Sequence, residues 1–334
     1  MRRAHLILIA VFAVTTAACA KAQPPAMQPS APVAGAVLWV EPTDLATRDV
    51  FHGPWGQENA PNSADTFRYV ETKRSGVNRG MTVKDSQGRE WSVKTPFPGN
   101  LDSEAPVEVT VSRLLSAVGY PQPPVYFLPA FDLKDDLGTR TLVGGRFRLT
   151  HPSLTDAGSW SWAENPFVGT PPYQGLLVMM MMLNNSDMKD RNNTLYQRRA
   201  GDLVEQWYAV RDAGAALGDT TRWAPRTNHI ESFERAPFIV GVNQGHVDFA
   251  YKGAHRDLVD DRISPADVAW ISNWLGRLSD RQWRDAFRAG GYEPAVAARF
   301  IKRLRDKVSQ GRALDYSWRK ASTGSSAEAA RAGQ

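Results

Sequence analysis

The chain has 334 residues, of which 42% are hydrophobic and 22% are charged, a composition typical of a globular protein and not of a disordered or fibrous one. The formal net charge is +5, and the basic residues are spread along the chain, so the excess predicts no nucleic-acid partner. The length suits one large two-lobed domain or two smaller domains.

The first residues have the pattern of an export signal. A positive start at Met1–Arg3 precedes an apolar run over Leu6–Val14 and a stretch of small residues over Thr16–Ala22. We therefore predict a signal peptide over residues 1–22 and an exported protein that is periplasmic, secreted or anchored to the cell envelope by lipid. No later stretch reaches the ~20 apolar residues of a membrane span, so the sequence predicts no transmembrane segment.

Cys19 is the only cysteine, and two processing signals overlap there. Ala20-Lys21-Ala22 resembles a small-x-small cleavage site, which would leave the mature chain without a cysteine. Thr16-Ala17-Ala18-Cys19 resembles a bacterial lipoprotein box without its usual leucine, which would place a lipid anchor on Cys19. Both alternatives exclude disulfides, a catalytic thiolate and a zinc site with cysteine ligands.

The first part of the folded body predicts strands followed by a helix. Alternating, β-branched and aromatic residues predict antiparallel strands over Thr66–Glu71, Met81–Lys84 and Glu90–Lys94, with a tight turn at Asp85–Arg89. Apolar residues at helical spacing then predict a helix over Val107–Val118, ended by Gly119.

The later part of the chain is mainly helical in its pattern. We predict a helix over Tyr173–Leu183, a hairpin that pairs Thr194–Gln197 with Glu205–Val210, and three further helices that begin at Pro265, Asp280 and Val296. The change of pattern near Pro129 divides the body into an N-lobe at 38–129 and a C-lobe at 130–318. A Pro- and Ala-rich tether at 23–37 precedes them, and a flexible tail at 319–334 follows.

Residues suited to phosphoryl transfer flank the predicted hairpin. Asp187 and Asn192 stand before it, five positions apart, and Asp212 follows it directly. Phosphoryl transfer requires a carboxylate near the attacking hydroxyl, and Mg²⁺ prefers carboxylate and amide oxygens as ligands. Because a hairpin returns the chain beside itself, we expect these three side chains to gather around one point.

The order Asp187-x4-Asn192, hairpin, Asp212-Ala213-Gly214 resembles the signature of the protein-kinase-like superfamily. The pattern is similar to that of its atypical branches: the HipA-like kinases, the secretory-pathway casein kinases, the CotH kinases and the phosphoinositide kinases. The resemblance covers about Phe67 to Gly218. It implies an α+β, two-lobed protein-kinase-like fold with a β-rich N-lobe that contains one helix, and a mainly helical C-lobe.

The resemblance also implies roles for residues on both sides of the site. Asp187 would act as general base or position the acceptor hydroxyl, Lys189 would stabilise charge on the transferred group, and Asn192 and Asp212 would hold Mg²⁺ or Mn²⁺. In the N-lobe, Lys94 would bind the ATP phosphates and pair with Glu108, or alternatively with Glu104. Gly76 and Gly80 would lie in the loop that covers the phosphates.

The sequence departs from common protein kinases at three points. Ser186 replaces the usual Arg before the catalytic Asp, Ala213 replaces the Phe of D-F-G, and no A-P-E motif follows. These differences put regulation by loop phosphorylation and protein substrates in doubt, but they remove no expected metal or phosphate ligand.

Three functions follow from these patterns. The first is an exported phosphotransferase that uses Mg-ATP on an unidentified hydroxyl of a protein or a small molecule. The second is a nucleotidyl (AMP) transferase on the same fold, and the third is a non-catalytic nucleotide- or ligand-binding protein of the cell envelope. Taken singly, each site residue has a structural explanation, such as a turn hydrogen bond or a solvated strand end. Their joint order along the chain favours the catalytic interpretations.

Overall fold

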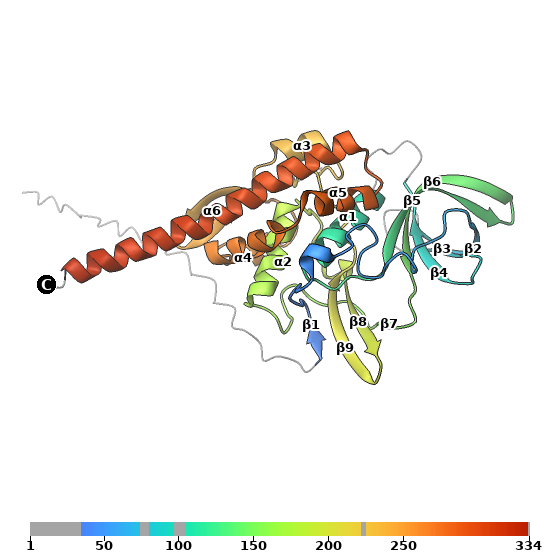
Figure 1. Ribbon diagram of the computed structural model, residues 1–334, viewed down its shortest axis with the longest axis horizontal. Helices are drawn as coiled ribbons and strands as arrows, with labels where there is room; N and C mark the ends of the chain where they lie inside the picture. The colour runs from blue at the N-terminus through green and yellow to red at the C-terminus, as the bar shows by residue number, and fades with distance from the viewer. Residues whose placement is uncertain (1–34, 74–79, 97–103, 222–224, 333–334) are drawn as a thin grey trace, which may run out of the picture.

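The computed structural model describes residues 35–73, 80–96, 104–221 and 225–332, with side chains as far as residue 314. It is a mixed α+β structure in which a sheet-rich N-terminal part adjoins a helix-rich C-terminal part (Figure 1). The predicted signal peptide and Cys19 lie outside the described residues. None of the helices in these four ranges combines the length and apolar character needed to cross a membrane.

Five strands of the N-terminal part close into a barrel. They are β2 (Thr66–Lys73), β3 (Gly80–Lys84), β4 (Glu90–Lys94), β5 (Val125–Asp135) and β6 (Gly138–Leu149), in the order β2-β3-β4-β6-β5. Neighbouring strands are antiparallel, except that β2 and β5 close the barrel in parallel. The interior is filled by large apolar side chains, among them Phe67, Trp91, Phe131 and Phe147. The three strands predicted from alternation are thus confirmed.

The turn between β3 and β4 is fixed by the buried side chain of Asp85. Its Oδ1 accepts hydrogen bonds from the amides of Gln87 and Arg89, and its Oδ2 accepts one from the Trp91 indole at 2.9 Å. These bonds stabilise the predicted hairpin, and the β3–β4 register then places Gly80 opposite Lys94. The turn therefore determines where the last residue of β4 lies.

Helix α1 (Glu104–Ala117) connects the barrel to the helical part of the molecule (Figure 1). Its apolar side chains, including Val107, Val111 and Leu114, belong to the large core formed with the C-terminal helices. At its end, the Arg48 guanidinium donates to the carbonyls of Ser116 at 2.8 Å and Ala117 at 3.2 Å. Those contacts satisfy carbonyl groups that a helix end leaves without intrahelical partners.

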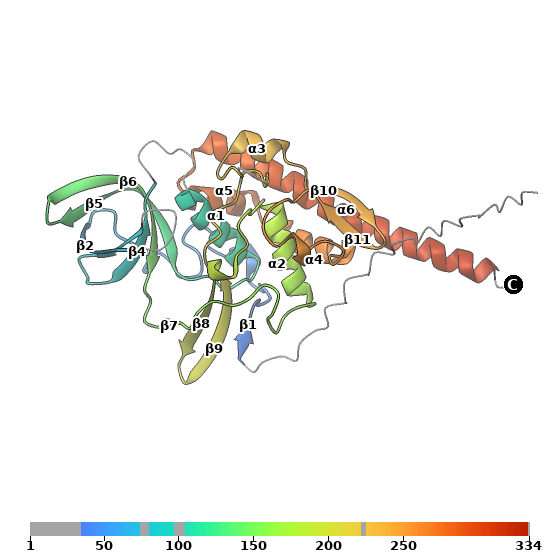
Figure 2. The ribbon, with the colours of Figure 1, turned by 180° about the vertical axis from the view of Figure 1, so that it is seen from behind.

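The C-terminal part combines helices with two small sheets. Its helices are α2 (Pro171–Met182), α3 (Ile230–Arg235), α4 (Pro265–Leu275), α5 (Asp280–Ala289) and α6 (Pro294–Ala332). Strands β8 (Asn193–Ala200) and β9 (Leu203–Val210) form the predicted hairpin, flanked by β7 (Leu154–Asp156) and β1 (Ala36–Val37), and β10 (Ile239–Asn243) pairs with β11 (His246–Phe249). Short 3-10 turns lie at Leu45–Thr47, Asp190–Asn192 and Arg256–Leu258. Figure 2 shows α6 running along the helical part and beyond it.

Three predicted boundaries need correction. Pro129 lies within β5, and the β5–β6 pair keeps the chain in the barrel as far as Leu149, so the sheet-rich part extends well past 129. Proline is tolerated there because the β2–β5 ladder covers only Asp132–Lys134 of β5.

The end of the predicted tether forms β1, which pairs with β9. The predicted tail at 319–334 instead continues α6 to Ala332, in keeping with its high alanine content.

The end of α1 provides a test of how closely the N-terminal segment packs on it. Gly119 has a φ of +104°, and a Cβ there would lie 2.2 Å from the Val40 carbonyl oxygen, whereas Gly138 has a φ of +113° with no atom within 4 Å. Gly138→Ala should cost about 1–3 kcal/mol in unfolding free energy for backbone strain alone. Gly119→Ala should cost at least about 1 kcal/mol more. Denaturant unfolding measures both; equal losses would contradict the close contact.

Candidate active site

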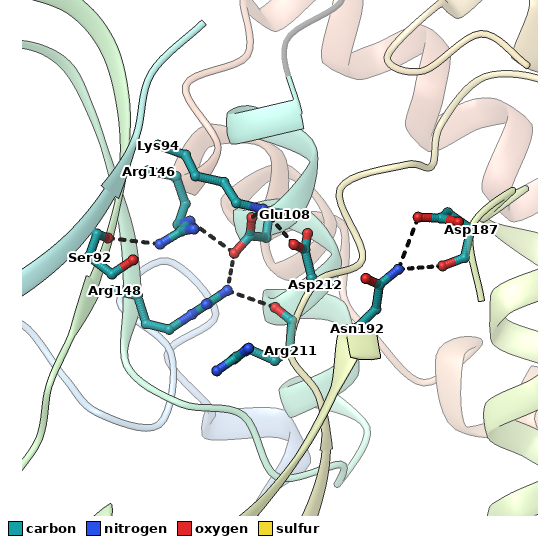
Figure 3. A network of polar contacts seen from close by, with 9 residues as sticks. All are labelled: Ser92, Lys94, Glu108, Arg146, Arg148, Asp187, Asn192, Arg211 and Asp212. Carbon is teal, nitrogen blue, oxygen red and sulfur yellow. Dashed lines mark hydrogen bonds and ion pairs between the residues drawn. The ribbon is translucent and has the colours of Figure 1, made fainter. Parts of the chain in front are cut away.

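The ammonium group of Lys94, at the end of β4, joins three parts of the chain. Its Nζ lies 3.2 Å from Glu108 Oε2 on α1 and 2.6 Å from Asp212 Oδ2 just after β9 (Figure 3). The predicted contact with Glu108 is therefore present. The Lys94 side chain is 19% exposed, so it is mostly but not fully buried.

The Glu108 carboxylate is buried among cations. Its side chain is 1% exposed, Arg146 Nε lies 2.9 Å from Oε1, and Arg148 pairs with the same oxygen. Burial acts to raise the pKa of Glu108, but Arg146, Lys94 and Arg148 together outweigh it and hold the pKa at about 2. Glu108 is therefore ionised at any physiological pH.

The two arginines come from β6, and sequence reasoning did not find them. Arg146 lies opposite Lys94 and Arg148 opposite Ser92 in the β4–β6 register. Since successive residues of a strand point to opposite faces, both arginines face α1 while Phe147 between them fills the barrel. Burial lowers the pKa of Arg146 to about 10, which leaves it protonated at neutral pH. The alternation Arg146-Phe147-Arg148 was the available signal, but it carries no motif.

The β8–β9 hairpin brings Asn192 and Asp212 side by side, as the sequence predicted. The Asn192 carbonyl accepts hydrogen bonds from the amides of Arg211 at 3.0 Å and Asp212 at 2.9 Å. The Arg211 carbonyl in turn accepts from Arg148 at 2.8 Å. The segment that carries Asp212 is thus tied both to the loop before β8 and to the barrel.

Asp187 lies on the other side of Asn192. Asn192 Nδ2 donates to the Asp187 carbonyl at 2.6 Å and to its Oδ2 at 3.2 Å, and Lys189 Nζ lies 2.5 Å from Oδ1. In Figure 3 the Asn192 side-chain oxygen points away from Asp187, toward Asp212. The Asp187 side chain is 33% exposed, so it lies partly at the protein surface.

A buried lysine of α6 fixes the loop that leads to Asp187. Lys307 Nζ donates to the Met182 carbonyl at 2.7 Å and to Asn184 Oδ1 at 3.1 Å, and Asn184 Nδ2 donates to the Gly218 carbonyl at 2.8 Å. Asn184 has a φ of +53°, a left-handed conformation that asparagine tolerates. Burial lowers the pKa of Lys307. No local pattern pointed to this contact, which joins residues more than a hundred positions apart.

Glu104, the alternative partner of Lys94, lies at the edge of the same site. Burial raises its pKa, opposed by the charge of Lys94 and assisted by Asp212. A Cβ on Gly214 would lie 2.8 Å from the Glu104 Cβ, so the start of α1 packs closely on the residues that follow Asp212. Lys94 itself pairs with Glu108 and not with Glu104 in the ion pairs of the described residues.

The predicted phosphate-covering loop is described only at its end. Gly76 lies outside the described residues. Gly80 begins β3 opposite Lys94, and the atom nearest to a Cβ there would be the Lys73 Cβ at 3.4 Å, an ordinary van der Waals distance. Gly80 thus lies close to the site at a position that has room for a larger side chain.

The oxygens of Asp212 and Asn192 suit a hard divalent cation. One carboxylate and one amide oxygen are ligands that Mg²⁺ accepts, since it usually retains waters and takes phosphate oxygens as further ligands. Within the described ranges no three His, Cys, Asp or Glu side chains gather as a metal site of their own. The donor set therefore fits a metal that binds together with a phosphate ligand better than an all-protein metal cage.

Comparisons with known proteins find resemblance in structure alone. No protein-family model and no curated protein matches the chain. Among solved structures, the chain is similar to the Helicobacter pylori proinflammatory kinase CtkA, with 13% identity over 75% of this chain and 95% of that one and a TM-score of 0.39. A Golgi casein kinase with Mn/ADP bound gives 7% identity over 75% and 73% of the two chains, and a TM-score of 0.39.

A third similar structure is a Rio2 kinase–ADP/Mg²⁺-phosphoaspartate complex from Chaetomium thermophilum. It gives 12% identity over 72% of each chain and a TM-score of 0.32. Scores and identities this low carry no argument about activity.

Three cations surround Glu108, so replacing Glu108 should lower the unfolding free energy more than replacing Lys94 does. Glu108→Gln leaves two arginines, one of them fully buried, without a counter-charge and should cost about 3–5 kcal/mol in unfolding free energy at pH 7. Lys94→Met leaves Glu108 with Arg146 and Arg148 and should cost less than about 2 kcal/mol. Denaturant unfolding of the two variants checks this order, and a larger loss for Lys94→Met would contradict it.

The low pKa of Glu108 also predicts a specific acid sensitivity. A carboxyl whose pKa is lowered from 4.5 to about 2 on folding contributes stability that is complete above about pH 4.5 and is lost as the pH falls through about 2. Wild type should therefore lose stability over this window more steeply than Glu108→Gln, which has no group to protonate there. Parallel slopes for the two proteins would show that Glu108 is not held ionised.

Proposed function

We propose that the chain is an atypical kinase-like phosphotransferase that uses ATP with Mg²⁺ or Mn²⁺. The observation that carries this proposal is the position of Lys94 between Glu108 and Asp212. Protein kinases place a lysine of the third strand against a glutamate of the following helix, and an aspartate after the later hairpin holds the metal. The same three residue types meet here, from the third strand of the barrel, helix α1 and the end of β9.

The charges of the site suit a bound nucleotide. Lys94 would bind the phosphates. When the Lys94 ammonium turns toward the phosphates, Arg146 and Arg148 would still neutralise the charge of Glu108. Asp212 and Asn192 would hold the metal, which would neutralise phosphate charge and orient the transferred group. Lys94 can leave Asp212 without stranding a buried charge, because both side chains are partly exposed.

Asp187 is the proposed group that acts on the acceptor. It would accept or orient the proton of the acceptor hydroxyl, and Lys189 beside it would stabilise charge on the transferred phosphoryl group. Asn192 Nδ2 donates to the Asp187 carbonyl and to its carboxylate, which would hold that carboxylate at the edge of the proposed metal site. Catalysis would then depend mainly on positioning and electrostatics.

The acceptor is an unidentified hydroxyl on a protein or a small molecule. A nucleotidyl transferase would use the same metal and lysine residues but would attach AMP to its acceptor, and a non-catalytic protein would bind nucleotide without any product. Intact-mass spectrometry distinguishes the three, since a phosphoryl group, an AMP group or no addition gives different masses.

We further propose that the protein is exported by a signal peptide over residues 1–22. Expression of the full chain in a bacterial host, followed by fractionation and mass measurement, tests this. A mature chain that begins at Gln23, or one that carries lipid on Cys19, supports export. A full-length chain confined to the cytoplasm contradicts it.

The roles of Asp212 and Asp187 should separate in nucleotide binding and turnover. Asp212→Asn should abolish the metal dependence of ATP binding measured by calorimetry. Asp187→Asn keeps the shape of the side chain and removes its charge, so it should leave nucleotide affinity nearly intact and lower turnover by roughly two to four orders of magnitude. Equal ATP binding with and without a chelator in wild type would refute the proposed function, and full turnover in Asp187→Asn would refute its role.

A further inference from the structure

Arg148 forms a second connection between the barrel and the Asp212 segment. One of its terminal nitrogens pairs with Glu108 and also donates to the Arg211 carbonyl at 2.8 Å, directly before Asp212 (Figure 3). Together with the Lys94 contacts, this closes a ring that runs from Lys94 through Glu108, Arg148 and the Arg211–Asp212 peptide back to Lys94. The ring has one link through the Asp212 side chain and one through its neighbouring backbone.

The two links differ in what a bound ligand would do to them. The Lys94–Asp212 ion pair joins the two groups that the proposed function assigns to phosphate and metal, so ligand binding would break it. The Arg148 contact uses a backbone carbonyl and a carboxylate with no role toward the ligand, so it would persist. The Arg148 side chain is only 12% exposed and is held by a fully buried carboxylate.

We propose that Arg148 is a positioning residue that keeps Asp212 in place relative to α1 when Lys94 releases it. The proposal rests on the proposed function for the release of Lys94, but the redundancy of the two links is a property of the protein alone. Arginine suits this role because its planar guanidinium presents several donors in fixed directions, whereas a lysine ammonium is a compact charge on a flexible stem. Neutralising Glu108 does not by itself require Arg148, since Arg146 and Lys94 also contact it.

Amide hydrogen exchange of the 208–216 segment tests the redundancy without any nucleotide. Arg148→Lys keeps the charge and Lys94→Met removes the other link, and each alone should speed exchange only slightly. The double variant should speed it by roughly tenfold more than the product of the single effects, as expected for coupled contacts. The matched control is Arg140→Lys. Arg140 is an exposed residue of the same strand and pairs with Asp135, so its replacement should not change exchange in the 208–216 segment.

Exchange in α4 reports how far a variant has destabilised the whole protein, and each effect on 208–216 is measured relative to it. Single effects that simply multiply, or an Arg148→Lys change that is silent in the Lys94→Met background, would overturn the proposal. Nucleotide binding gives an independent arm: Arg148→Lys should weaken Mn²⁺-dependent ADP binding roughly tenfold relative to Arg140→Lys, at an equal melting temperature. If wild type binds no nucleotide, the proposed function is wrong. The hydrogen-exchange comparison of the single and double variants still tests the role of Arg148 in that case.

Discussion

The rest of the site depends on the ion pairs that the buried Glu108 carboxylate forms with Lys94, Arg146 and Arg148. The Glu108 side chain is only 1% exposed, and its negative charge is stable in this buried position only because these three cations surround it. The same carboxylate fixes the side chains of two barrel strands against α1. Since α1 also belongs to the core of the C-terminal helices, this one group connects the barrel, the helical part and the segment that carries Asp212.

The proposed function requires Lys94 to move from its protein partners to a phosphate, and the excess of cations around Glu108 would allow this. If Lys94 were the only counter-charge of Glu108, moving it to a phosphate would leave a buried anion unpaired, at a cost of several kcal/mol. With the two arginines in place, the proposed movement of Lys94 to a phosphate would leave Glu108 paired. The opposite side of the site is fixed differently, by the backbone bonds of Asn192 to the Asp212 segment and by the anchoring of Asn184 through Lys307. One side therefore relies on charge and the other on hydrogen bonds.

The features that local patterns encode were predictable from the sequence. Short stretches carry the alternation in β2 to β4, the helical spacing of α1 and the hairpin that pairs Thr194–Gln197 with Glu205–Val210. These local patterns sufficed to predict that Lys94 meets Glu108 and that Asn192 meets Asp212. The β5–β6 pair was not predicted because Pro129 and Gly144-Gly145 interrupt its pattern, and the roles of Arg146 and Arg148 were missed with it. Lys307 lies on α6, where a helix was predicted, but nothing in the helical pattern marks its contact with Asn184. Their contacts join distant segments, so only the folded chain shows that these cations are buried.

A structure with ADP and Mn²⁺ bound would show whether Lys94 exchanges its protein partner for a phosphate. We expect the Lys94 ammonium to leave Asp212 for a phosphate oxygen, Asp212 and Asn192 to bind the metal, and Glu108 to keep its contacts with Arg146 and Arg148. A nucleotide bound elsewhere, with the Lys94–Asp212 ion pair intact, would contradict this expectation.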